Sequence, residues 1–321
     1  MKKYAVIGLT VLLLAAAGCG QTVTSNQPAS QGAETQANQA GAITIRDFAD
    51  RTITFPSSPK KIVALANGEM DIVYALGGEL VGRPTATGPV AIQSAEKLPQ
   101  VGSTHGIDLE KVALLGPDVV LGNQPMNMKD IASVEGIGSK MVLTSANSIE
   151  DVKKQISLFG QLMQKETKAQ ELNQAIDAKL KDIQSAASGA KPRVLMVYGA
   201  PGTYMAALNN SLSGDILVAS GGENIAADYP KLENYPQYAQ LNTENIMKSN
   251  PQLIVLMSHG NSDKVKEGFL KEMQQNAAWS SLDAVKNNHV EVLPNDLFGT
   301  NPGSRVVEAL DLMTKLLQSV K

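Results

Sequence analysis

The feature that most constrains the fold of this chain is a pattern of strands and helices that occurs twice, on either side of a long helical segment. In the first block, residues 61–65 and 118–121 form short apolar runs that are typical of buried strands. In the second block, residues 193–198 and 253–256 repeat this pattern. Because such runs alternate with stretches of helical spacing, each block predicts an α/β lobe with a parallel sheet covered by helices.

Further elements complete each block. Helices are expected at residues 69–76, 109–115, 214–219, 265–274 and 305–319. Apolar and polar residues alternate on both sides of Asp50 and Arg51, at residues 43–46 and 52–55, which predicts a hairpin before the first block.

The segment between the blocks is helical. Ser148 begins a capping pattern, and apolar residues recur at helical spacing over 149–162 and again over 169–183, until Gly189 and Pro192 end the run. The second run predicts a rod of about 30 Å, at about 1.5 Å per residue. Two ordinary helices of the first lobe are the alternative, but the strand pattern resumes directly after the rod. We therefore expect an α/β fold of two Rossmann-like lobes joined by one long α-helix.

The N-terminal residues have the pattern of an export signal. Lys2 and Lys3 precede an apolar stretch at 6–17 that is too short to span a bilayer. The segment AAGC at 16–19 resembles the lipobox of bacterial lipoproteins, which implies cleavage before Cys19 and its acylation. We expect a signal peptide over 1–19, a polar flexible tether over 20–42, an N-terminal lobe over 43–164, a connecting helix over 165–190 and a C-terminal lobe over 191–321.

Composition and motifs argue against several classes of protein. The net charge is -3, with 28 Lys and Arg against 31 Asp and Glu, so no basic excess indicates a nucleic-acid partner. The single cysteine excludes an internal disulfide framework. The sequence lacks a nucleophile elbow, a phosphate-binding loop and a zinc-protease motif, so we do not expect an enzyme.

Segments throughout the body of the chain resemble the siderophore-, haem- and corrinoid-binding proteins of ABC importers. These segments are IRDFADRTITFP (45–56), PKKIVAL (59–65), LLGPDVVL (114–121), GGEN (221–224), TENI (243–246), NPQLIV (250–255) and WSSLDAVK (279–286). The resemblance implies a ligand cleft between the lobes, a monomer, and delivery of the ligand to an ABC permease and its ATPase. It also places the protein on the extracytoplasmic face of the cell membrane, held there by its lipid anchor.

Within that family the second half is most similar to the haem-binding lipoproteins of the iron-regulated surface determinant systems. PGTY (201–204), SHG (258–260) and KNNHV (286–290) carry this similarity. It implies that haem is the transported ligand, taken up free or from a haem-donor surface protein. In those lipoproteins a His of the second lobe and a Met of the first lobe bind the iron.

The second-lobe His matches His259, which follows a predicted strand and so lies where open α/β sheets bind ligands. The position of the first-lobe Met falls in VGSTHG (101–106) and holds His105 instead, which predicts two imidazole ligands. If the register is shifted, the first-lobe ligand is a methionine, for which the candidates are Met70, Met126, Met128 and Met205. His289, in a polar turn before a strand, is expected to be structural.

Other residues are candidates for the ligand pocket and for docking. Asn67 and Gly68 open a helix after a strand, where Asn67 is a plausible cap and free amides could bind a propionate. Arg83 could add positive charge and Tyr204 could contact the ligand, although a solvated arginine and a packed tyrosine are the alternatives. The resemblance further implies that Glu110 and Glu244 dock onto the permease.

A second ligand class stays open within the same family. Ferric siderophores or corrinoids would be captured by the same architecture, although neither demands opposed histidines. Aromatic residues make up only 4% of the chain, which weighs against a pocket that stacks on catecholates.

Overall fold

The computed structural model describes residues 41–86, 90–199, 202–258, 262–275 and 278–320. Gln39–Lys321 form one compact unit. The signal-peptide and acylation predictions, including Cys19, lie outside the described residues, as does nearly all of the predicted tether. Within the described part of the chain, none of the helices is both long enough and apolar enough to cross a membrane.

The first lobe is built on a parallel sheet with the strand order β3-β6-β7. Its strands are β3 (Ile62–Ala64), β6 (Val119–Asn123) and β7 (Lys140–Thr144). The expected N-terminal hairpin is present as β1 (Ile43–Arg46) and β2 (Thr52–Phe55), paired antiparallel. A second, shorter hairpin is formed by β4 (Gly102–Ser103) and β5 (Gly106–Ile107).

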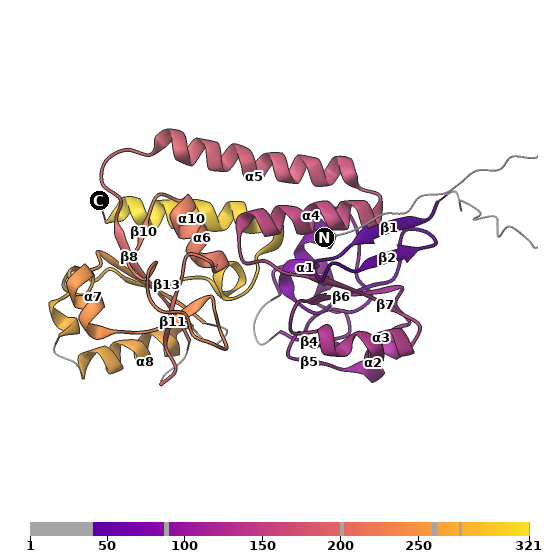
Figure 1. Ribbon diagram of the computed structural model, residues 1–321, viewed down its shortest axis with the longest axis horizontal. Coiled ribbons are helices and arrows are strands. Elements are labelled where there is room, and N and C mark those ends of the chain that lie inside the picture. The colour runs from indigo at the N-terminus through magenta and orange to yellow at the C-terminus, as the bar shows by residue number, and fades with distance from the viewer. Residues whose placement is uncertain (1–40, 87–89, 200–201, 259–261, 276–277, 321) are drawn as a thin grey trace, which may run out of the picture. The chain divides into compact units, whose positions relative to one another are not determined.

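Short helices connect these strands (Figure 1). They are α1 (Asn67–Ala75), α2 (Leu109–Leu115) and α3 (Ile131–Gly136), with single 3₁₀ turns η1 (Gln93–Ala95) and η2 (Met128–Asp130). Asp108 caps α2 by accepting a hydrogen bond from the Lys111 amide, and Gly116 ends that helix in the left-handed conformation.

Two long helices follow the first lobe. The helix α4 (Ile149–Met163) begins at Ser148, whose hydroxyl accepts a hydrogen bond from the Asp151 amide as the capping pattern predicts. The helix α5 (Glu166–Ala186) has 21 residues and is the expected long rod, about 30 Å in length. It packs along α4 and also contacts α10, so it is supported by both lobes.

The second lobe has a six-stranded sheet with the order β11-β9-β8-β12-β13, to which β10 adds beside β8. Its strands are β8 (Arg193–Tyr198), β9 (Met205–Ala207), β10 (Glu223–Asn224), β11 (Tyr238–Gln240), β12 (Leu253–Met257) and β13 (Val290–Val292). The strands β8, β10, β12 and β13 are parallel, whereas β9 and β11 are antiparallel to their neighbours.

The helices of the second lobe lie on both faces of this sheet (Figure 1). They are α6 (Leu212–Ala219), α7 (Thr243–Ser249), α8 (Ser262–Gln274), α9 (Asp283–Lys286) and α10 (Val306–Ser319). Shorter turns are the 3₁₀ segments η3 (Trp279–Ser281) and η5 (Gly303–Arg305) and the π-helical turn η4 (Asn295–Gly299).

Alternate residues of the central strands enter different cores, which explains why the strands are continuous apolar runs. In β8, Val194 and Met196 face the helices α6 and α10, while Leu195 and Val197 face the side covered by α7 and α8. The first lobe repeats this arrangement, with its own smaller core on the side covered by α2 and α3.

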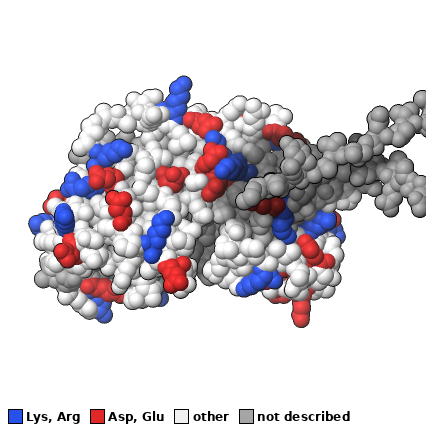
Figure 2. Space-filling model, in the orientation of Figure 1, with Lys and Arg blue, Asp and Glu red and all other residues white. Residues whose placement is uncertain are grey.

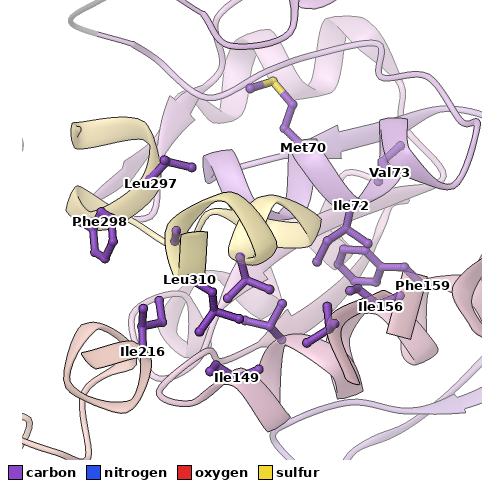
Figure 3. Close-up of a cluster of buried hydrophobic side chains, with 14 of the residues drawn as sticks. Met70, Ile72, Val73, Ile149, Ile156, Phe159, Ile216, Leu297, Phe298 and Leu310 are labelled. Atoms are coloured by element: carbon purple, nitrogen blue, oxygen red, sulfur yellow. The ribbon is translucent and has the colours of Figure 1, made fainter. Parts of the chain in front are cut away.

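The largest core is shared by the two lobes. Its buried residues include members of α1, α4, α6, η4 and α10, and Figure 3 shows Leu310 of the last helix in the same cluster as Ile72 and Phe159 of the first half. In Figure 1, α4, α5 and α10 lie along the same side of both sheets. The lobes are therefore joined by a continuous hydrophobic layer as well as by the connecting helix.

Hydrogen bonds reinforce this junction. Asp71 of α1 accepts hydrogen bonds from the amide and the hydroxyl of Ser304, at 2.7 and 2.6 Å. Asn301 donates to the buried Gln155 of α4 at 2.8 Å, and Asp215 of α6 accepts from the Ile149 amide at the start of α4 at 2.7 Å. We call these contacts the interlobe hydrogen bonds.

Candidate ligand-binding site

The start of α1 follows the carboxyl end of β3, where ligands bind in open α/β sheets. The prediction that Asn67 caps this helix is wrong: Ala66 is the N-cap, and Asn67 is the first helical residue. Asn67 is half-buried, and no hydrogen bond of its side chain joins it to another described residue. Gly68 lies so close to the Asn301 side chain that a Cβ at this position would clash with it.

His105 lies at the tip of the short hairpin β4–β5. We call residues 102–107 the His105 hairpin. Thr104 and His105 form its turn, the imidazole is exposed, and the His105 amide donates to the Ser103 hydroxyl at 3.2 Å. Gly102 has a φ of 93°, and its Cβ position is blocked by the Gly106 carbonyl, so the hairpin requires glycine there.

The candidate methionines lie in three different environments. Met70 is buried in the shared core (Figure 3), and Met205 is half-buried in β9. Met126 and Met128 are 39% and 48% exposed, in the loop that follows β6. Between them, Asn127 donates a hydrogen bond to the Thr104 carbonyl, so these two methionines belong to a loop that contacts the His105 hairpin.

Arg83 is buried and directed at backbone carbonyls. Its two Nη atoms donate to the carbonyls of Pro84 and Glu96, at 3.0 and 3.1 Å, and its Nε has no partner among the described residues. The alternative of a solvated side chain is therefore wrong for Arg83. Its contribution to ligand binding stays a prediction.

Tyr204 packs within the second lobe. Its ring meets Phe269 edge-on with centroids 5.0 Å apart, and its hydroxyl donates to the Val265 carbonyl at 3.4 Å. Burial, and to a lesser degree the charge of Glu272, raises the pKa of Tyr204 to about 12, so the hydroxyl is protonated at neutral pH. These contacts are the ones expected of a packed tyrosine, which was the alternative to a ligand-binding role for Tyr204.

Of the other two histidines, only His289 belongs to the described residues. His259 lies outside the described residues; the strand before it, β12, ends at Met257. His289 is half-buried, its Nδ1 lies 3.2 Å from the Gln252 carbonyl, and its own carbonyl accepts from Ile254 at the amino end of β12. This contact supports the expectation that His289 is structural.

Buried carboxyl groups near α1 were not expected from the sequence. Burial raises the pKa of Glu69, against the opposing effect of a hydrogen bond from the Thr144 hydroxyl at 2.6 Å, and its other oxygen has no described partner. Burial also raises the pKa of Asp71, although the hydrogen bonds from Ser304 lower it. No sequence signal distinguishes Glu69 from the solvated acidic residues that are common in a first helical turn, or Asp71 from a solvated residue further along the helix.

The two predicted docking residues occupy equivalent positions. Glu110 is the second residue of α2 after the cap Asp108, and Glu244 is the second residue of α7 after the cap Asn242. Both are exposed, and neither forms an ion pair with a described residue. By contrast Asp108 is bound by Lys111, whose side chain and amide lower its pKa.

The described residues form no competing surface site that is suited to a particular class of ligand. On the face drawn in Figure 2, basic and acidic residues are interspersed over both lobes. A polar hollow of about 480 Å³ opens at the amino end of β8, but Arg193 within it donates to the carbonyls of Ser249 and Asn250. Among the described residues, no three His, Cys, Asp or Glu side chains form a group suited to a metal ion.

Comparison with known proteins assigns the family. Residues 62–297 match the family model described as periplasmic binding protein. The chain belongs to the periplasmic binding protein family. The match spans the parallel sheets of both lobes and the two long helices between them.

Named relatives of this periplasmic binding protein include the high-affinity heme uptake system protein IsdE of Staphylococcus aureus. The MRSA252 sequence is 31% identical over 239 residues, which cover 74% of this chain and 79% of IsdE. The sequence of strain Newman gives the same identity and coverage.

Solved structures show the same two-lobed architecture. An ABC transporter substrate-binding protein of Listeria monocytogenes EGD-e matches with a TM-score of 0.70 and 30% identity, over 81% of this chain and 99% of that one. The structure of S. aureus IsdE complexed with heme matches with a TM-score of 0.69 and 28% identity, over 80% and 98%. The expected α/β fold of two lobes joined by a long helix is thus confirmed.

Proposed function

We propose that this periplasmic binding protein captures haem outside the cytoplasmic membrane and delivers it to an ABC permease and its ATPase. The single observation that carries the proposal is the exposed imidazole of His105, at the tip of a hairpin tied to the carboxyl end of β6. The likeness to IsdE, named as a heme uptake protein, supports haem as the ligand.

The proposed iron ligands are His105 from the first lobe and His259 from the second. Haem iron takes axial ligands on opposite faces of the macrocycle, so two facing walls are needed. Two imidazoles donate more strongly to ferric iron than an imidazole and a thioether, so bound haem should favour the oxidised state. Asn67 and Gly68 at the start of α1, with Arg83 and Tyr204, are proposed to line the pocket and to bind the propionates.

The test is a titration of the soluble body with haemin, followed by absorption spectroscopy. We expect a saturable one-to-one low-spin spectrum in the wild type, which is lost in His259→Ala and becomes high-spin in His105→Ala. His289→Ala is the matched control, because its ring contacts the Gln252 carbonyl, and it should keep the wild-type spectrum. No specific spectrum in the wild type would refute haem capture, and ferric siderophores would then be titrated.

A second variant tests the ligand pair itself. His105→Met replaces an imidazole by a thioether and should raise the reduction potential of the bound haem while keeping it six-coordinate. An unchanged potential in His105→Met would show that His105 does not bind the iron, and Met126→Ala and Met128→Ala would then be compared.

Docking and anchoring complete the proposal. The carboxylates of Glu110 and Glu244, exposed at equivalent helix positions, are proposed to bind basic pockets of the permease, where such charges steer encounter and orient the complex. Cys19 is proposed to carry acyl chains that hold the protein on the outer face of the cell membrane. Cys19→Ala should release the protein from membranes and leave haem binding unchanged.

A further inference from the structure

A buried asparagine lies behind the His105 hairpin. Asn127 is 0% exposed, although the methionines on either side of it are exposed. Its Nδ2 donates to the Thr104 carbonyl at 3.1 Å and to Asp130 Oδ2 at 2.9 Å, and its Oδ1 accepts from the Asn123 amide at 2.9 Å. The whole hydrogen-bonding capacity of the amide nitrogen is thus used, which is expected of a buried polar group that fixes a structure.

We propose that Asn127 is a positioning residue, which fixes the tip of the His105 hairpin and thereby holds the imidazole in place to bind iron. This inference rests on the proposed function, because it assigns His105 the role of an axial ligand. Asn127 itself is not proposed to touch the ligand.

The geometry separates the tip of the hairpin from its base. Backbone bonds secure the base: the Thr85 amide donates to the Gly102 carbonyl at 2.7 Å, and the Asp108 amide donates to the Val101 carbonyl at 2.9 Å. At the tip, the Thr104 carbonyl directly precedes His105 and is bound by the Asn127 side chain. Loss of Asn127 should therefore release the tip while the base remains in place.

The strand beside Asn127 is adapted to this contact. Gly122 of β6 lies against Asn127 and Met141: a Cβ at position 122 would be 3.0 Å from Asn127 Oδ1 and 2.6 Å from the Met141 methyl group. The Asn127 amide also donates to the Asn123 carbonyl at 2.8 Å, so the side chain and the backbone of Asn127 both bind the last residue of β6. Asn127 thus connects the hairpin tip to the central strand of the first-lobe sheet.

The experiment uses Asn127→Asp, which keeps the acceptor for Asn123 and removes the donors for Thr104 and Asp130. In ferric haem complexes, free imidazole is titrated until it displaces His105. Loss of the hydrogen bond to Thr104 should lower the half-displacing concentration about fivefold, equivalent to about 1 kcal/mol. Asn173→Asp is the matched control, because Asn173 also donates to a backbone carbonyl, that of Lys153 in α4, and it should show no change.

A double-mutant cycle shows whether the effect passes through His105. In a His105→Ala background, Asn127→Asp should cause no further change in imidazole binding, because the side chain that it positions is absent. An equal effect of Asn127→Asp with and without His105 would overturn the inference, since it would indicate a general disturbance of the pocket.

A compensating pair separates positioning from stability. When Asn127→Asp is combined with Asp130→Asn, the amide introduced at position 130 can donate to the carboxylate introduced at position 127, but the Thr104 carbonyl still lacks its donor. We expect this pair to recover the thermal stability lost in Asn127→Asp. The imidazole concentration that half-displaces His105 should stay as low as in Asn127→Asp alone. Recovery of both properties would mean that Asn127 acts only by stabilising its loop, which would overturn the inference.

A ligand-free measurement keeps this inference distinct from the proposed function. In the apo protein, the NMR order parameter of the His105 amide should fall from about 0.85 to below about 0.6 in Asn127→Asp. If wild-type protein gives no haem spectrum, the proposed function fails and this measurement still decides whether Asn127 positions His105. An unchanged order parameter would overturn the positioning role itself.

Discussion

Truncation of one leucine in the last helix should weaken the whole molecule. Leu310 of α10 is 0% exposed and belongs to the core shared by the lobes, together with Ile149 of α4 and Ile216 of α6 (Figure 3). Leu310→Ala leaves a cavity between elements that come from both halves of the chain. Because each half loses packing, we expect a single cooperative transition at lower denaturant concentration.

The magnitude follows from the complete burial of this side chain. Leu→Ala substitutions in packed cores cost about 2–5 kcal/mol, and a value of about 3 kcal/mol changes the unfolding equilibrium by roughly two orders of magnitude. With a urea dependence of about 3 kcal/mol per molar, the midpoint should fall by about 1 M. Leu114→Ala is the matched control. Because Leu114 is 87% exposed on α2, this variant should unfold at the wild-type urea midpoint.

Two probes report on the two lobes separately. Trp279, the only tryptophan of the chain, is 7% exposed in the second lobe, so its fluorescence follows that lobe. Hydrogen exchange of the amides of β3, β6 and β7 follows the first lobe. In Leu310→Ala, the denaturant midpoints reported by the two probes should fall by the same amount. If fluorescence shifts and the first-lobe amides keep their wild-type midpoint, the lobes unfold independently and the shared core does not couple them.

Three further variants, one of them a double substitution, test particular residues. Asp71→Ala leaves the Ser304 amide and hydroxyl without their acceptor and should lower the free energy of unfolding by about 2 kcal/mol in urea titrations; an unchanged value would show that this interlobe hydrogen bond contributes nothing. Burial raises the pKa of Glu69, so folded protein keeps a proton that the unfolded chain releases, and wild-type stability should fall as the pH rises above about 4 through the raised pKa. Glu69→Gln should remove the share of this pH dependence that Glu69 contributes, raising the urea midpoint at about pH 8 and not at about pH 4, while Asp71, whose pKa is also raised, keeps its own share; equal slopes in both proteins would contradict the assignment. Glu110→Ala combined with Glu244→Ala should lower haem uptake by cells roughly tenfold with binding in solution unchanged, and normal uptake would exclude these residues from docking.

The sequence predicted the arrangement of strands and helices well because parallel strands buried on both faces have a distinctive pattern. Residues 193–198 and 253–256 are uninterrupted apolar runs, and the structure buries alternate residues of each run in different cores. The capping pattern at Ser148 and the length of α5 were predictable for a related reason, because local hydrogen bonding and helical spacing determine them.

The sequence did not predict the shared core, because periodicity shows which face of a helix is buried and not what covers it. Nothing in the pattern around Leu310 indicates that its partners lie on α4 and α6. Buried polar residues present the same difficulty: Glu69 resembles an ordinary acidic residue of a first helical turn, and Asn127 resembles an ordinary loop asparagine. Their burial depends on backbone segments that only the tertiary structure brings together.

Candidate site residues were predictable to different degrees. His105 could be singled out because histidine is rare in this chain, and the structure exposes it at a hairpin tip. The environment of Arg83 could not be predicted, because nothing in the sequence pattern shows that its guanidinium is buried against the carbonyls of Pro84 and Glu96.

The contact between Asp71 and Ser304 joins residues 233 positions apart, which has a consequence for synthesis. When α1 leaves the ribosome, the η5 segment that packs against it has not yet been translated. The first lobe therefore cannot complete its packing in the order in which it is made, and its apolar faces remain open to chaperones until the last helix emerges. A chain that stops before residue 303 should consequently be degraded or aggregate as a whole, and should not leave a stable first lobe behind.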